Sequence, residues 1–143
     1  MILPDINLLL YAHIDSFPQH QPSRAWWNAA MNSTTPVALA EPVVFGFIRV
    51  ATHRKVFSTP LPVYAALACA RGWLEHDGTR WISQTPASVR LAFELLEQVG
   101  TAGNLTTDAQ LAALAIDNQA TLFSADADFA RFPGLRWTNP LAG

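Results

Sequence analysis

The sequence is poor in charge, in cysteine and in long apolar runs, and each shortage excludes a class of protein. Only 14% of its 143 residues are charged, whereas 50% are hydrophobic. This balance excludes a disordered chain and predicts a compact domain with a large core. A single cysteine, Cys69, excludes an internal disulfide bond. The densest apolar run, residues 63–70, is far shorter than the roughly 18 residues of a membrane-spanning helix.

Positive charge is also scarce. Nine Lys and Arg residues stand against eleven Asp and Glu residues, which gives a formal net charge of −2. Proteins that bind nucleic acids usually carry a basic excess, so the net charge alone argues against that class. The amino terminus lacks the cationic start of a signal peptide, so a cytoplasmic location is expected. The apolar excess further predicts that a second copy or another chain covers part of the surface.

Short strand-like runs alternate with helical stretches along the whole chain. We expect strands at residues 1–4, 37–40, 79–83, 121–124 and 135–137. We expect helices at residues 6–13, 22–31, 41–52, 63–76, 86–100 and 106–120, and a short helical turn at 127–132. Such alternation predicts βαβ units and a parallel sheet covered on both faces. The sequence therefore predicts one α/β domain spanning residues 1–143.

Acidic residues follow three of the predicted strands. Asp5 follows the first strand, Glu41 the second, and Asp126 and Asp128 follow the strand at 121–124, while Asp108 lies at the start of a predicted helix. Ligands of open parallel sheets bind at the carboxyl ends of the strands, so these side chains are expected at one edge.

Two interpretations of these acids compete. Each acid alone is explained as a helix cap, because a carboxylate at a helix start accepts backbone N–H bonds and suits the helix dipole. Capping does not explain why nearly every strand-to-helix junction carries an acid. Converging carboxylates repel one another unless some are protonated or a cation neutralises them. Ligands that offer only oxygen select hard ions such as Mg²⁺ or Mn²⁺.

Four short motifs surround these acids in a fixed order. They are LPDIN at 3–7, ALAEPVVFGFIRV at 38–50, NLTTDAQLAALA at 104–115 and SADADF at 124–129. With these motifs, nearly the whole chain resembles the PIN-domain ribonucleases, and most of all the VapC-type toxins of bacterial toxin–antitoxin pairs. The resemblance implies an α/β/α sandwich around a central parallel sheet. It also implies a Mg²⁺- or Mn²⁺-dependent endoribonuclease that cleaves structured RNA, either tRNA or rRNA.

The resemblance assigns roles to individual residues. It implies a catalytic set of four acids: Asp5, Glu41, Asp108 and Asp126. Metal ligands are expected to be Asp5, Asp108, Asp126 and Asp128, although Asp128 is alternatively the cap of the short helix that follows. Asn7 and Ser124 match polar positions that support the site. Hydrolysis would proceed through activated water, without a covalent nucleophile.

Partners are implied by the same resemblance and by the distribution of charge. Once the site acids are set aside, cations outnumber the remaining acids, and Arg49, Arg54 and Lys55 cluster beyond Glu41. These three are candidate RNA contacts. Arg54 and Lys55 are equally explained as exposed cations at a helix end, and Arg49 as an ion-pair partner of Glu41. The tryptophans are assigned to core or interface. RNA, a cognate antitoxin and a second copy of the chain are the expected partners.

Three alternatives compete with the toxin hypothesis. LFSADAD, at residues 122–128, looks like the motif of haloacid dehalogenase-type phosphatases, but no Lys or acid follows Asp128 in this chain. A non-catalytic binding module with the same fold would be expected to have lost one or more acids. A PIN nuclease of RNA processing shares every motif; only the compact length favours the toxin.

Overall fold

A computed structural model describes residues 1–142 and contains one parallel sheet of five strands. The strands are β1 (Ile2–Pro4), β2 (Val37–Leu39), β3 (Thr79–Trp81), β4 (Thr121–Phe123) and β5 (Trp137–Thr138). They lie in the order β3-β2-β1-β4-β5, and each neighbouring pair is parallel. The predicted parallel sheet is therefore confirmed, with β1 at its centre.

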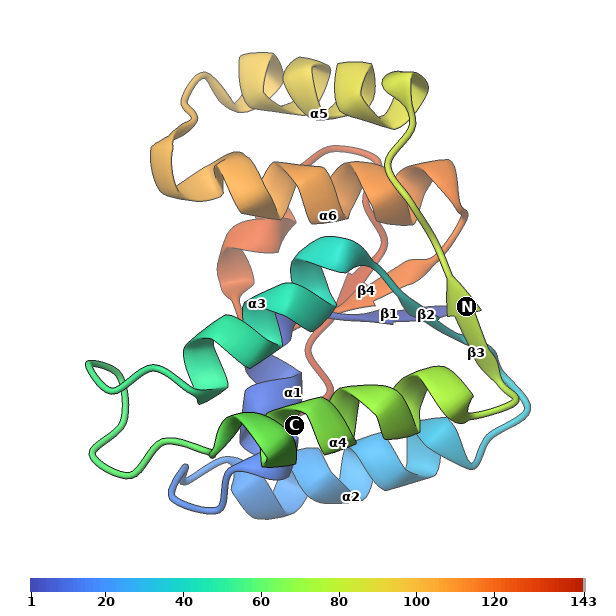
Figure 1. The fold of residues 1–143 in the computed structure, drawn as a ribbon. Coiled ribbons are helices and arrows are strands. Elements are labelled where there is room, and N and C mark those ends of the chain that lie inside the picture. Colours follow the sequence, from blue (N-terminus) through green and yellow to red (C-terminus); the bar gives the residue numbers. More distant parts are fainter. Residues whose placement is uncertain (143) are drawn as a thin grey trace.

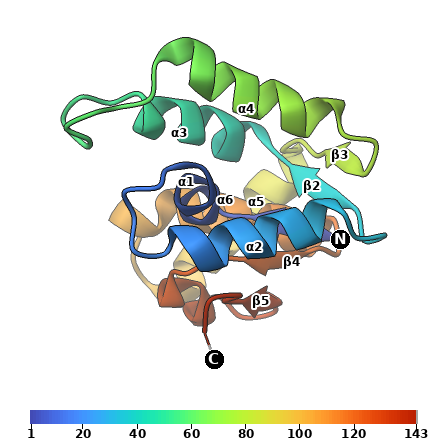
Figure 2. The same ribbon diagram turned by 90° about the horizontal axis from the view of Figure 1, so that it is seen from below.

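Helices cover both faces of the sheet. They are α1 (Ile6–His13), α2 (His20–Met31), α3 (Glu41–Ala51), α4 (Val63–Glu75), α5 (Pro86–Val99) and α6 (Thr106–Asp117), with 3-10 turns η1 (Gly103–Leu105) and η2 (Ala127–Arg131). Helices α5 and α6 lie on one face, and α2 and α4 lie on the other (Figures 1 and 2). This arrangement confirms the α/β/α sandwich. Within residues 1–142 no helix is both long enough and apolar enough to cross a bilayer.

Local sequence signals explain several of these boundaries. Pro42 occupies the first turn of α3, where its missing N–H leaves no bond unmade. Thr85 and Ser88 form a capping box at the start of α5, each side chain accepting from the other's backbone N–H. Gly100 ends α5 with a φ of 85°, a left-handed conformation that glycine adopts without strain. The core lies between the sheet and the apolar faces that these helices bury.

The structure corrects some predicted boundaries. Helix α2 begins at His20, two residues before Pro22, because proline is tolerated anywhere in the first turn. Helix α6 ends at Asp117, and Gln119, with a φ of 55°, turns the chain toward β4. The last strand is Trp137–Thr138 and not residues 135–137. The 3-10 turn η1 was not predicted from the sequence.

Candidate metal site at the carboxyl edge of the sheet

Asp5 joins the end of β1 to the start of α1. Its backbone N–H donates to the carbonyl of Phe123, at the end of β4, over 2.8 Å. Its carboxylate caps α1, since Oδ1 accepts from the Ile6 N–H at 2.7 Å and Oδ2 accepts from the Ser124 hydroxyl at 2.7 Å. Burial raises the pKa of Asp5 above its usual value, although both hydrogen bonds oppose that shift. The capping interpretation is therefore correct for Asp5, and it leaves the side chain fixed at the sheet edge.

The Ser124 hydroxyl holds the two central strand ends together. This fully buried side chain donates to Asp5 and accepts from Asn7 Nδ2 at 3.2 Å and from the Asp126 N–H at 3.0 Å. The backbone carbonyl of Ser124 accepts from the Trp137 indole N–H at 3.1 Å. One hydroxyl thus orients Asp5, Asn7 and the backbone of Asp126. The contact from Trp137 was missed, because nothing in the sequence links a tryptophan of the last strand to Ser124.

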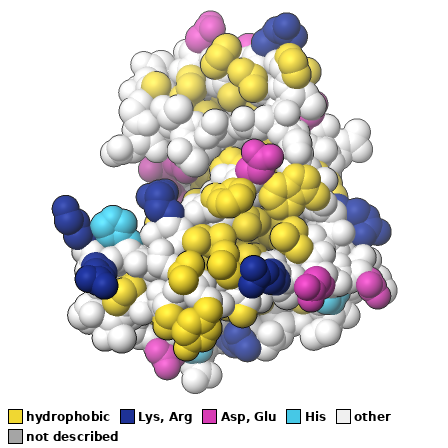
Figure 3. All heavy atoms as spheres, in the orientation of Figure 1, with side chains coloured by type: hydrophobic (Ala, Val, Ile, Leu, Met, Phe, Trp, Pro, Cys, Tyr) yellow, Lys and Arg dark blue, Asp and Glu magenta, His cyan; other side chains and the backbone are white. Residues whose placement is uncertain are grey.

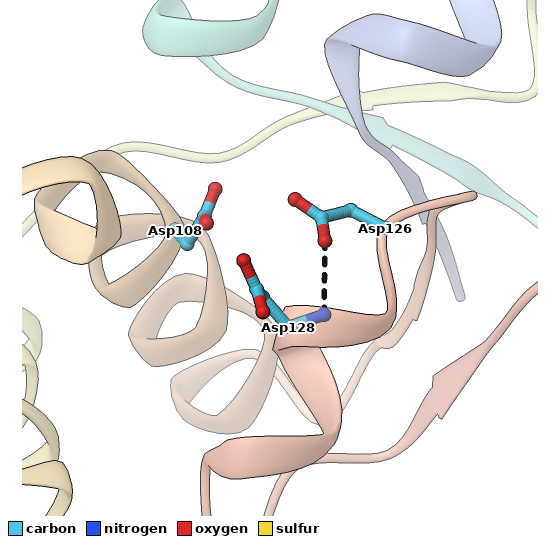
Figure 4. Close-up of side chains that lie close together, drawn as sticks. All are labelled: Asp108, Asp126 and Asp128. Atoms are coloured by element: carbon cyan, nitrogen blue, oxygen red, sulfur yellow. Dashed lines mark hydrogen bonds between the residues drawn. The ribbon is translucent and has the colours of Figure 1, made fainter.

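Three further acids converge beside Asp5. Asp108 lies in the first turn of α6, and Asp126 and Asp128 lie in the segment that follows β4. Each of the three offers a carboxylate oxygen, and these oxygens all lie within 4.8 Å of one another (Figure 4). Asp126 Oδ1 accepts from the Asp128 N–H at 2.9 Å and caps η2. The alternative that Asp128 is the cap is therefore wrong, and its carboxylate faces the other two acids instead.

The electrostatics of Asp108 connect this group to Asp5. The pKa of Asp108 is raised from 3.8 to about 6, first by burial and then by the negative charges of Asp5, Asp126 and Asp128. Like charges disfavour the ionised form, so the four carboxylates share one electrostatic site. Carboxylate oxygens alone suit a hard divalent ion, whose charge would offset this repulsion. The donor set therefore fits Mg²⁺ or Mn²⁺.

Glu41 occupies a different position from the other acids. It is exposed at the first residue of α3, and it lines a small cavity of about 60 Å³ with Ile82, Ser83 and Leu114. The group of three converging acids does not include it. The sequence correctly predicts Glu41 at a strand-to-helix junction, but its carboxylate stands apart from Asp108, Asp126 and Asp128.

The three predicted RNA contacts are not part of the acid group. Arg49 is exposed in the last turn of α3. Arg54 and Lys55 are exposed in the turn that follows, where the Lys55 N–H donates to His53 Nδ1 at 3.0 Å. Their side chains are available to a partner, and their role in RNA binding stays a prediction.

The tryptophans divide into three kinds of environment. Trp27 and Trp73 are buried, and their rings meet edge to face at 6.0 Å. Trp26 stacks on Phe123 with 5.4 Å between ring centroids. Trp81 is 44% exposed on β3, which rules out the core for this residue and leaves the interface assignment as a prediction.

Comparison with known proteins identifies the family. The profile of the PIN domain matches residues 2–135. Ribonuclease VapC33 of Mycobacterium tuberculosis H37Rv is 48% identical over 141 residues, which cover 99% of each chain. The crystal structure of VapC20 from M. tuberculosis, described as a sarcin–ricin loop cleaving toxin, matches 95% of this chain and 99% of its own at 18% identity, with a TM-score of 0.71.

A further solved structure is VapBC2 of Rickettsia felis bound to a DNA fragment from its promoter. It matches 97% of this chain and 98% of its own at 22% identity, with a TM-score of 0.67. These two structures support the fold, and the identity to VapC33 confirms the resemblance predicted from the four motifs. A haloacid dehalogenase-type phosphatase is thereby excluded. The chain belongs to the PIN-domain family, within its group of VapC ribonucleases.

Proposed function

We propose that the protein is the endoribonuclease toxin of a toxin–antitoxin pair and cleaves structured cellular RNA, tRNA or rRNA. Cleavage would use Mg²⁺ or Mn²⁺ at the acidic edge, the carboxyl edge of the sheet that carries Asp5, Asp108, Asp126 and Asp128. One observation carries this proposal. Asp108, Asp126 and Asp128 place carboxylate oxygens within 4.8 Å of one another, and their charges, with that of Asp5, raise the pKa of Asp108 to about 6. If no cation bound here, nothing would offset the repulsion among these carboxylates.

We assign a different role in the reaction to each residue of the site. Asp108, Asp126 and Asp128 would hold the ion, and Asp5 would complete the site from β1. When bound, a divalent ion would supply an activated water and would offset charge on the reacting phosphate. Ser124 and Asn7 orient Asp5 and the turn at Asp126 through the bonds described above. Glu41, which lies outside the group of three acids, would act through water.

We assign the positioning of RNA to cations at the end of α3 and in the turn that follows it. Arg49, Arg54 and Lys55 are exposed and are assigned to phosphate contacts, which fix the position of a nucleic acid without reading its sequence. The name of VapC20 as a toxin that cleaves the sarcin–ricin loop supports a structured RNA as substrate. We place the reaction in the cytoplasm, where such RNA is found.

An antitoxin would bind over α3 and α4. Phe45, Val63 and Tyr64 are 65%, 61% and 74% exposed, and hydrophobic side chains gather over these helices on the face in Figure 3. Exposed apolar patches of this kind mark protein interfaces. The VapBC2 complex of R. felis supports such a partner. We also propose a homodimer, in keeping with the family.

The decisive experiment measures RNA cleavage by wild-type protein and by Asp5→Asn and Asp126→Asn, each with Mg²⁺, with Mn²⁺ and with a chelator. We expect cleavage by the wild type only when an ion is present, and a loss of about 10³-fold in both variants. Asp117→Asn, at the exposed end of α6, is the matched control and is expected to cleave like the wild type. Cleavage in chelator would refute the metal mechanism, and full activity of Asp5→Asn would refute its role.

A nuclease of RNA processing outside a toxin–antitoxin pair is the alternative. Induced expression in a bacterial host separates the two functions. A toxin arrests growth, and co-expression of a small protein encoded beside its gene restores it. An RNA-processing nuclease causes no arrest that such a neighbour relieves.

A further inference from the structure

A cavity of about 710 Å³ lies at the opposite end of α1 from Asp5. Its walls come from the end of α1, the α1–α2 loop, the start of α2 and the α3–α4 loop. The two loops project to the same side of the molecule (Figures 1 and 2). Helix α1 has eight residues and so spans about 12 Å, which separates the cavity from the acidic site. The volume falls within the range of small-molecule sites.

The lining of this cavity is mixed in character. Its ionisable and hydroxyl groups come from His13, Asp15, Ser16, His20, Arg24, Ser58 and Thr59. Apolar walls are formed by Ile14, Phe57, Pro60, Leu61 and Pro62. A simple anion would meet the carboxylate of Asp15, and a purely apolar ligand would leave the charged groups without partners. A ligand with both a charged and a flat apolar part fits better.

The hydrogen bonds of the two histidines show which ring nitrogens are free for a ligand. His13 is committed to the fold, since Nδ1 bonds the Leu9 carbonyl at 2.8 Å and Nε2 accepts from the Trp73 indole at 3.3 Å. His20 donates its Nδ1–H to the Tyr11 carbonyl at 2.7 Å, so Nε2 of the neutral ring is a free acceptor and not a donor to an anion.

Arg24 is the main cation of the cavity. It uses Nη1 to donate to the Ala12 carbonyl at 3.4 Å, a long contact. A guanidinium carries five N–H donors, so most of them stay available to a phosphate. Arg24 therefore forms the side of the cavity suited to an anion, and the wall of Phe57 and the prolines suits a base.

We propose that this cavity receives one nucleotide of the bound RNA, with its phosphate against Arg24 and its base against Phe57 and the proline wall. The proposal rests on the ribonuclease function. Proteins that recognise RNA commonly splay single bases out of loops and bind them in pockets beside phosphate contacts. The cavity would thereby select RNA with an unpaired nucleotide about one length of α1 from the cleaved bond.

Two variants test this site, and a third is the control. Arg24→Gln removes the cation, Ser58→Tyr fills the cavity from an exposed loop position, and Arg90→Gln removes an exposed cation of α5 that does not line the cavity. Each is combined with Asp5→Asn so that RNA is bound without being cut. Binding of a pool of random-sequence RNA oligonucleotides is measured by fluorescence anisotropy at several NaCl concentrations, after thermal melts establish that every variant is folded.

We expect Arg24→Gln to lower the slope of log affinity against log salt by about 0.7, the value for one lost phosphate contact on a single strand. Ser58→Tyr is expected to weaken binding about tenfold with the salt slope unchanged, because a base contact is lost. Arg90→Gln is expected to bind like the parent. Equal binding and equal slopes in all three variants would overturn the proposal.

Two further measurements distinguish a nucleotide of bound RNA from a free nucleotide as the ligand of the cavity. In the catalytically intact background, Arg24→Gln and Ser58→Tyr are expected to raise KM for RNA and leave kcat unchanged. Titration with the four nucleoside monophosphates is expected to show only weak binding, because a free nucleotide lacks the rest of the RNA chain. Tight binding of a monophosphate with unchanged KM would identify a free nucleotide as the ligand and overturn the RNA assignment. If the wild type cleaves RNA but KM is unaffected, this inference fails while the ribonuclease function stands.

Discussion

The two sides of the acidic edge hold their carboxylates in different ways. On the β1 side, both oxygens of Asp5 accept hydrogen bonds, from Ile6 and Ser124. On the α6 side, every resolved influence on Asp108 raises its pKa, namely burial and three like charges. Hydrogen bonds therefore offset part of the cost of burying the charge of Asp5, whereas no resolved interaction favours the ionised form of Asp108, which a cation would stabilise. Asp5, which two hydrogen bonds hold in place, therefore lies next to a group of acids that repel one another.

The largest test of this difference is Asp108→Asn. Cleavage is expected to fall about 10³-fold, because one ionised group that stabilises the reaction is lost. Stability without added metal is expected to rise, since the substitution removes a charge that its neighbours repel. After allowance for solvent screening at this half-buried side chain, we expect a gain of about 1 kcal/mol. Cleavage assays and thermal melts of the same preparations measure both effects.

Asp117→Asn is the matched control for Asp108→Asn, because it changes an exposed acid at the other end of the same helix. It is expected to change neither cleavage nor stability by a measurable amount. If Asp108→Asn lost stability as well as activity, Asp108 would be a structural residue and the repulsion we describe would not exist.

Ser124→Ala tests the anchored side. Its hydroxyl serves Asp5, Asn7 and Asp126 at once, so its loss frees three groups while leaving all acids in place. Residues that orient metal ligands typically contribute 10- to 100-fold to metal affinity or activity, and we expect a loss of about that size. The concentration of Mn²⁺ that gives half-maximal cleavage should rise.

The control for this prediction is Thr34→Ala, in the exposed turn before β2. It also removes a side-chain hydroxyl, but at a position away from the acidic edge, so the Mn²⁺ requirement is expected to stay that of the wild type. An unchanged Mn²⁺ requirement in Ser124→Ala as well would mean that Asp5 is positioned by its backbone alone.

Glu41→Gln tests whether the acid that stands apart belongs to the reaction. Because Glu41 is exposed and lies outside the group of three acids, we expect its substitution to lower cleavage only about tenfold, as for a residue that acts through water. Cleavage rates at saturating Mn²⁺ are compared with those of Asp126→Asn. Losses of equal size would show that Glu41 approaches the ion directly when RNA is bound.

The sequence predicts the sheet edge well because strand ends carry their signal locally. Asp5, Asp126 and Asp128 each follow a short apolar run, and parallel strands must bring such positions to one edge. Asp108 is recognised because apolar residues repeat behind it at helical spacing.

The sequence does not predict which side chains bond to one another across the edge. The link from Ser124 to Asp5 joins residues 119 positions apart in the chain. That Asp126 caps η2, and not Asp128, depends on the turn geometry after β4. The position of Glu41 depends on how α3 leaves β2, which propensity does not specify. Contacts of this kind depend on tertiary packing, so local patterns carry little information about them.

The smallest expected effect is a pH dependence of stability in the absence of divalent ions. The pKa of Asp108 is about 6 in the folded state and 3.8 ordinarily, so its contribution to stability is full below pH 4 and is lost as the pH rises to 6. The pKa of Asp5 is also raised, so its contribution to stability is likewise lost as the pH rises. Burial lowers the pKa of His13, which therefore acts in the opposite direction as the pH falls.

Asp5 and His13 are present in both wild type and Asp108→Asn. The difference in stability between the two proteins therefore isolates the contribution of Asp108. In chelator, the melting temperature of the variant minus that of the wild type should grow by about 4 °C between pH 4 and pH 7, the equivalent of about 1 kcal/mol. Mn²⁺ at pH 7 should stabilise the wild type more than the variant and reduce the difference, since bound cations relieve the same repulsion. A difference that does not change with pH would mean that Asp108 is ionised at no cost. The difference that we describe between Asp5 and Asp108 would then not exist.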